Sequence, residues 1–199
     1  MGATPQLLKP LLHQAVRMVE EFHANRTQNP RPDRLRFLPS DQDQSPPPNW
    51  SKPNASRDLA ARVAFSLARK TGARCGYLAV GEPALHAVIR MWLLVAGMKA
   101  GRVLRGDIEE KDFPRLISAA GKIAGSSLVF SDQDVPKKKI RETARKFIEE
   151  SQLEFLVVDD PDVETLSNPS LLPEMERWRI RMEFREAVRG TNVMLILPG

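Results

Sequence analysis

The sequence predicts an α/β fold in three layers, in which helices cover both faces of a mostly parallel sheet. Short, almost wholly apolar segments alternate with longer segments of helical periodicity. Apolar strands of this kind are buried on both faces, and strands separated by helices pair in parallel through right-handed crossovers. The 199 residues, of which 42% are hydrophobic, suffice for one domain of ordinary size with an additional segment.

The first predicted element is an amphipathic helix from Pro5 to about Asn25. Its apolar residues recur at spacings of three and four, which places them in one stripe along the helix. The stripe consists of Leu8, Leu11, Leu12, Ala15, Val19 and Phe22. Prolines within residues 29–33 then end the helix. We therefore expect an arm over residues 1–28 and a body over residues 29–199.

The body begins with a short predicted strand, Arg34–Leu38, and a proline-rich loop over residues 39–55. Three consecutive prolines and many polar residues exclude regular structure from this loop. The tract could bind a groove of a partner in the polyproline conformation, or it could be a linker.

The rest of the body alternates helices and strands. Helices are predicted over residues 58–70, 83–96, 108–124, 137–151 and 173–189. Strands are predicted over residues 75–80, 127–130, 155–159 and 193–197. In the last helix, Met175, Trp178 and Met182 have the spacing of core residues.

Composition limits the chemistry of the chain. Cys75 is the only cysteine, and His13, His23 and His86 lie far apart, so we expect neither a disulfide nor a metal site. A net charge of +5 favours polyanionic partners such as DNA without requiring them. The longest strongly apolar stretch, Met91–Met98, is shorter than the roughly 20 residues that span a bilayer. No secretion signal is recognisable, so we expect a cytoplasmic protein that does not bind membranes.

The strand over residues 155–159 carries the most informative residue. Doubly wound sheets bind ligands at the carboxyl ends of their strands. This strand is an apolar run that brings Asp159 to that edge, as a Walker B strand does when it holds magnesium. A strand-end aspartate is also a common helix cap or loop residue.

The order of the elements resembles the C-terminal RecA-like ATPase domain of bacterial replicative DNA helicases of the DnaB type. The resemblance covers most of the chain apart from the proline-rich loop, and from Lys70 to Asp159 it is almost without gaps. The matching segments are Ala68–Gly72, Val88–Met91, Ala96–Gly97, Leu104–Gly106, Phe113–Leu116, Ala119–Gly121, Ile140–Arg141, Leu156–Asp159 and Val193–Leu197.

The resemblance implies a RecA-like P-loop NTPase fold. It also places the amphipathic helix of residues 1–28 where the family has its linker helix, which packs on the neighbouring subunit of a ring. The apolar stripe of this helix would then be the oligomer contact, either with a second copy of this chain or with a helicase subunit.

The phosphate-binding loop departs from the family pattern. No glycine occurs between Leu38 and Asp58, although a P-loop needs glycines so that its backbone can surround phosphate. The family's Gly-Lys-Thr would fall at about Ser56, Arg57 and Asp58, where an arginine replaces the lysine. Asp58 would put negative charge where the triphosphate should lie. These three residues are therefore a vestigial cofactor site.

Other catalytic positions also depart from the family. The match puts Gly81 at the position of the catalytic glutamate and leaves Glu82 one residue further, where a strand would turn its side chain away. The last strand ends in Leu197 and Pro198 where the family has a polar sensor, and we expect the arginine-finger region to be missing. Glu82 and Asp159 are thus vestigial catalytic candidates. ATP and Mg²⁺ would bind only if the degenerate site still works.

Two basic segments could bind a polyanion or an acidic partner. Arg177, Arg181, Arg185 and Arg189 recur every four residues in the last helix, although interleaved glutamates are also typical of a solvated face. Lys137, Lys138 and Lys139 begin a helix, where positive charge opposes the helix dipole. This run is either kept for binding or is a flexible surface tract.

Together these features predict a catalytically degenerate helicase-like protein, an accessory or regulator of DNA replication that binds a helicase subunit or itself. Two alternatives stay open. The chain could be a divergent ATPase that completes its site in an oligomer and uses Arg57, Glu82 and Asp159. It could also be a non-enzymatic DNA-binding module that uses the arginines of its last helix.

Overall fold

The computed structural model describes residues 8–28, 55–80, 84–104, 106–131, 139–159 and 173–197. The predicted strand Arg34–Leu38 and most of the proline-rich loop lie outside these residues. The helices are α1 (Leu8–Gln28), α2 (Ala55–Lys70), α3 (Ala84–Ala96), α4 (Ala100–Leu104), the 3-10 helix η1 (Glu110–Asp112), α5 (Phe113–Ala124), α6 (Ile140–Ser151) and α7 (Pro173–Val188). The strands are β1 (Cys75–Leu78), β2 (Leu128–Phe130), β3 (Phe155–Val158) and β4 (Met194–Ile196).

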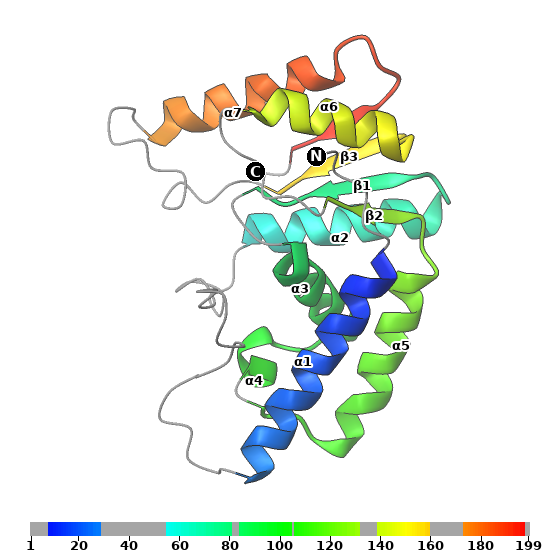
Figure 1. Cartoon of the computed structure of the whole chain (residues 1–199), viewed down its shortest axis with the longest axis vertical. Helices are drawn as coiled ribbons and strands as arrows, with labels where there is room; N and C mark the ends of the chain where they lie inside the picture. The colour runs from blue at the N-terminus through cyan, green and yellow to red at the C-terminus, as the bar shows by residue number, and fades with distance from the viewer. Residues whose placement is uncertain are drawn as a thin grey trace.

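The four strands form one parallel sheet in the order β2-β1-β3-β4, which confirms the predicted α/β class (Figure 1). In the pairing register, Cys75 of β1 lies opposite Leu128 of β2 and Phe155 of β3. The chain leaves β1 in one direction to form β2 and later continues in the other direction with β3 and β4. The carboxyl edge between β1 and β3 is therefore the switch point, where doubly wound sheets bind their ligands.

Alternation along the strands divides the apolar core between the two faces of the sheet. Cys75 and Tyr77 belong to a cluster with α1, α2, α3 and α5, whereas Leu78 belongs to a cluster with α6 and α7. In β3, Val157 lies in the first cluster and Leu156 in the second. Figure 1 shows α6 and α7 on one face and the other helices on the opposite face. Successive side chains of a strand point to opposite faces, so both faces must be apolar.

Helix α1 lies against helices of its own chain. We expected its stripe to contact a neighbouring subunit, but Leu11, Leu12, Ala15 and Val19 are buried in the first cluster, where α1 packs on α3, α4 and α5. This packing shields the apolar side chains of α3 and α5 from water as well as those of α1. The side chains of Leu8 and Phe22, the other two stripe residues, are outside the described ones.

The helix predicted over residues 108–124 is shorter than expected. It starts at Phe113, after the 3-10 turn of η1. Asp112 is buried and its carboxylate accepts hydrogen bonds from the backbone N–H of Glu109 at 3.1 Å and from Arg102 Nη2 at 3.2 Å. These bonds fix a turn before the helix and join it to α4, which the sequence did not predict. None of the described helices combines the length and the hydrophobicity needed to span a membrane.

Candidate functional site

Asp159 lies at the switch point of the sheet, directly after β3. Its backbone N–H donates to the carbonyl of Leu78 at 2.9 Å, which extends the pairing of β3 with β1 by one residue. Because Val157 and Val158 alternate between the two faces, Asp159 points to the face that α2 and α3 cover. The residue has no exposed surface.

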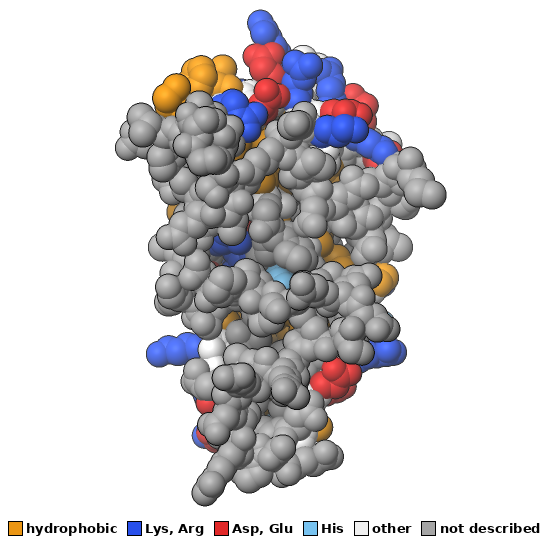
Figure 2. Space-filling model, turned by 60° about the vertical axis from the view of Figure 1, so that its left-hand side comes forward, with side chains coloured by type: hydrophobic (Ala, Val, Ile, Leu, Met, Phe, Trp, Pro, Cys, Tyr) orange, Lys and Arg blue, Asp and Glu red, His pale blue; other side chains and the backbone are white. Residues whose placement is uncertain are grey.

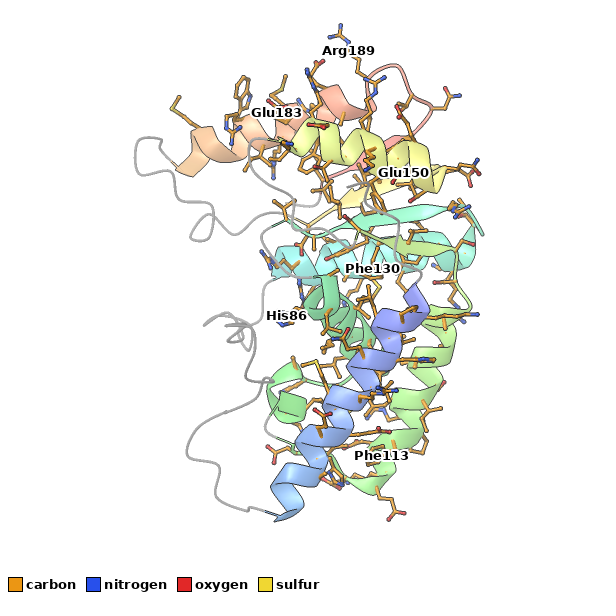
Figure 3. All side chains as sticks on the ribbon, viewed as in Figure 1. His86, Phe113, Phe130, Glu150, Glu183 and Arg189 are labelled. Carbon is orange, nitrogen blue, oxygen red and sulfur yellow. The ribbon has the colours of Figure 1, made fainter. Side chains whose placement is uncertain are left out.

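Three side chains from three different elements surround the Asp159 carboxylate. The Tyr77 hydroxyl donates to Oδ2 at 3.1 Å, and Arg90 Nη1 donates to the same oxygen at 3.3 Å. Arg57 Nε lies 3.6 Å from Oδ1, as an ion pair that is longer than a hydrogen bond. The Phe130 ring packs beside Tyr77 at a centroid distance of 5.2 Å, and Figure 3 shows Phe130 on β2. We call Arg57, Tyr77, Arg90 and Asp159 the Asp159 cluster.

The electrostatics of the Asp159 cluster set burial against attraction. Burial raises the pKa of Asp159 above its ordinary value, while Arg90, Arg57 and the hydrogen bond from Tyr77 oppose this rise. Burial and the nearby Asp159 charge raise the pKa of the Tyr77 phenol, so Tyr77 is a hydrogen-bond donor at neutral pH. Removing a buried carboxylate from water is tolerated only when cations or donors replace the water. The arginines supply that replacement.

Two of the residues that the sequence predicts as remnants of a nucleotide site come together in the structure. Arg57, in the first turn of α2, extends to Asp159 and forms an ion pair with it. Asp58 is half-buried on the same helix, and the side chain of Ser56 is outside the described ones. Glu82 also lies outside the described residues.

Tyr77 and Arg90 belong to the site but were not predicted from the sequence as site residues. A signal for Arg90 exists, because it is the only Lys, Arg, Asp or Glu in helix α3, whose other residues are apolar except His86. A charge in a helix that is buried over most of its surface needs an opposite charge nearby. Tyr77 carried a weaker signal, namely a hydroxyl in a strand whose four residues are all buried.

The residues at this edge do not suit a magnesium–triphosphate complex. Mg²⁺ prefers oxygen ligands in an open octahedral arrangement with several waters. Asp159 offers one carboxylate without exposed surface, and two guanidinium groups already lie within 3.6 Å of it. No group of three His, Cys, Asp or Glu side chains is placed to hold a metal ion in the described ranges. Cys75, also buried on this side, has its pKa raised by burial to about 12 and is a protonated thiol.

The basic residues of α7 are only partly a surface stripe. Arg185 and Arg189 are exposed, Arg181 is half-buried, and the side chain of Arg177 is outside the described ones. Arg189 pairs with Glu186 at 3.4 Å. Figure 2 shows basic and acidic side chains intermixed at the upper end of the molecule, which α6 and α7 form.

The lysine run before α6 can be placed only in part. Lys139 is exposed and lies just before the first residue of the helix. Lys137 and Lys138 lie outside the described residues.

The expected core positions on α7 are wrong for two residues. Met175 and Trp178 are 55% and 66% exposed, and Met182 is half-buried. The helix instead buries Ile180, Phe184 and Ala187, which occupy its opposite side. Helical spacing alone identified a stripe but could not tell which of two stripes faces the sheet.

No protein-family model and no curated protein matches the chain.

Proposed function

We propose that the chain is a RecA-like helicase core that no longer hydrolyses nucleotide and that acts in DNA replication by binding protein, either a replicative helicase subunit or a second copy of itself. The order of its elements supports the link to helicases. The pairing of Arg57 with Asp159 adds support, because the start of a P-loop helix and the Walker B aspartate hold the same metal ion in P-loop NTPases.

The burial of Asp159 between two arginines is the observation that carries the loss of hydrolysis. A catalytic aspartate of this class must hold magnesium, directly or through water. Here the carboxylate has no exposed surface, and its two oxygens face Arg57, Arg90 and Tyr77. In the side-chain conformation in which Arg57 pairs with Asp159, its guanidinium group is not free to bind an outer phosphate. The cluster therefore stabilises the contact of α2 and α3 with the sheet in place of a ligand.

Isothermal titration of the whole chain with ATP and MgCl₂ tests this loss. We expect no binding at micromolar nucleotide and no phosphate release above that of a buffer control, since the carboxylate is inaccessible. The Asp159→Asn variant should give the same result as the unchanged chain. Micromolar binding with turnover, abolished in Asp159→Asn, would instead favour the divergent ATPase.

A direct binding experiment tests the protein-binding half of the proposal. Sedimentation velocity of the chain mixed with a purified replicative helicase from the same source should show a complex that neither component forms alone. The complex should persist without ATP, because the proposed role uses surface contacts. Unchanged sedimentation of both components at about 50 µM, well above typical regulatory affinities, would contradict helicase binding.

A further inference from the structure

The outer face of α7 carries a stripe that neither the core nor the Asp159 cluster uses. It consists of Met175, Trp178, Met182 and Arg185, with Arg189 directly after the last residue of the helix, and we call it the α7 stripe. At about 100° per residue, these five positions fall within an arc of roughly 80°. The arc is centred opposite Ile180, Phe184 and Ala187, which pack against the second cluster. The α7 stripe therefore points directly away from the sheet.

The α7 stripe is separate from the candidate nucleotide edge. Asp159 faces the side of the sheet that α2 and α3 cover, whereas α7 lies on the other side with α6 (Figure 1). Two of the five large hydrophobic side chains that the described residues expose, Met175 and Trp178, belong to this one stripe. Trp, Met and Arg are the residue types enriched at protein interfaces. This composition indicates a binding surface.

The order of residues along the α7 stripe is self-complementary. Its amino-terminal half is apolar and aromatic, and its carboxyl-terminal half is basic. In an antiparallel pair of α7 helices related by a two-fold axis at Met182, a stripe residue before the axis meets the stripe residue at about the same distance beyond it on the partner helix. Trp178, four residues before Met182, would then lie nearest Arg185 of the second copy, three residues beyond it, and Met175 would face Arg189.

These pairings are chemically favourable. A guanidinium over the face of a tryptophan gains a cation–π attraction, and the long aliphatic stem of arginine covers methionine. The two Met182 side chains would meet at the axis, where flexible thioethers adapt to each other. On one flank, Arg179 would approach Glu186 of the second copy, which adds opposite charges.

The charge of this end of the molecule favours a second copy over a nucleic acid. Arg189 pairs with Glu186 at 3.4 Å, and on neighbouring α6 Arg145 and Lys146 pair with Glu149 and Glu150. Figure 3 shows Glu150 on α6, Glu183 on α7 and Arg189 just after the end of α7. A surface that binds a phosphate backbone needs basic residues without such compensation.

We propose that the α7 stripe is a homodimer contact in which two α7 helices pack antiparallel about a two-fold axis at Met182. This contact would be the surface through which the chain binds a second copy of itself, one of the two kinds of partner in the proposed function. Only the biological role of the dimer, not its formation, rests on that proposal. One helix face is small beside the roughly 800 Å² per partner of a standard interface. We therefore expect a weak dimer that forms in the micromolar range.

Charge variants at the axis give the sharpest test. In a two-fold contact Met182 faces Met182, so Met182→Lys and Met182→Glu should each raise the dimer Kd by at least about tenfold through like-charge repulsion. An equimolar mixture should dimerise again, because Lys then faces Glu. Ile117→Lys is the matched control, since Ile117 is 70% exposed on distant α5, and its Kd should equal that of the unchanged chain.

Sedimentation equilibrium of the full chain, from about 1 µM to about 500 µM, is the measurement. Three results would overturn the proposal: a monomer throughout this range, dimers unaffected by either Met182 variant, or a mixture that fails to reassociate. A monomer that binds single-stranded DNA and loses this binding in Met182→Glu would assign the α7 stripe to nucleic acid. Because the test contains neither nucleotide nor helicase, its failure is distinct from failure of the proposed function.

Discussion

At the scale of single residues, Asp159 is held by a balance in which no partner is dispensable. Its carboxylate gains two arginine neighbours and the Tyr77 hydroxyl but loses all contact with water. Buried ion pairs often contribute little in total, yet removing one partner leaves an uncompensated charge and is costly. The Asp159 cluster should therefore show strong coupling between its members rather than large independent contributions.

A double-mutant cycle between Arg90 and Asp159 measures this coupling. Arg90→Met keeps most of the side-chain volume but removes a cation and one of the two donors to Asp159 Oδ2, so we expect a loss of about 2–4 kcal/mol in the free energy of unfolding at neutral pH. Adding Asp159→Asn should restore at least about 1 kcal/mol. Urea unfolding of the four proteins gives the coupling, and simple additivity would contradict it.

The loss in free energy of unfolding caused by Arg90→Met should increase with pH. Since burial raises the folded-state pKa of Asp159, stability from this group is full below the ordinary aspartate pKa and falls as pH rises through the raised value. Losing Arg90 raises the pKa of Asp159 further. The difference in free energy of unfolding between Arg90→Met and the unchanged chain should therefore be larger at about pH 7.5 than at about pH 4.5. Arg145→Met, which breaks the exposed pair with Glu149, is the control and should cost less than about 1 kcal/mol.

At the scale of elements, the approach of α6 to the sheet depends on one residue of β1. Gly76 faces the second cluster, and a Cβ at this position would collide with the side chains of Leu153 and Phe147. The distance to Phe147 Cε1 would be 2.8 Å. Close packing of a helix on a strand therefore requires glycine here.

Alanine substitutions at two glycines should have opposite effects. Gly76→Ala should lower the free energy of unfolding by about 1–3 kcal/mol through overpacking. Gly121→Ala is the matched control, because Gly121 lies on the exposed side of α5 with no atom within 4 Å of its would-be Cβ, and it should stabilise the protein by up to about 1 kcal/mol. Thermal unfolding followed by circular dichroism compares the two, and equal melting temperatures would refute the packing argument.

The elements were easier to predict than the contacts between them. The strands around Tyr77 and Val157 were recognisable because buried parallel strands are short apolar runs. The role of Asp159 as an edge carboxylate was also readable. Its pairing with Arg90 was not, because the residues are 69 positions apart and only the topology of the sheet brings them together.

Which face of a helix is buried was also not predictable from the sequence. The spacing of Trp178 suits a core position, yet Phe184 and Ile180 form the stripe that is buried. When one helix has two apolar stripes, their spacing alone does not show which stripe is buried, because this depends on the position of the sheet. Likewise, periodicity predicted the stripe of α1 but not whether its own chain or a neighbour covers it.

At the scale of the whole molecule, the described helices and strands form one folded unit that includes α1. The stripe residues of α1 lie in the same cluster as Val88 of α3 and Leu116 of α5. If α1 only contacted a neighbouring subunit, substitutions in it would leave the rest of the chain folded. Because α1 is part of the core, substitutions at its buried positions should unfold the whole unit.

Aspartate substitutions at adjacent positions of α1 distinguish these cases. Leu12→Asp would bury a carboxylate in the first cluster, so we expect loss of the cooperative thermal transition. His13→Asp, one residue further on the exposed side, should change the melting temperature by only a few degrees. A well-folded Leu12→Asp monomer would mean that α1 is detachable after all.

The position of the Asp159 cluster also bears on how the chain reaches its native state. Tyr77 and Asp159 are 82 residues apart in the sequence, and every strand pairing within the described sheet joins segments separated by at least one helix. Such non-local pairings must overcome the entropy of closing long loops before they gain any contact energy. Arg57 and Arg90, from the helices before and after β1, can thus reach Asp159 only once β3 has docked against β1.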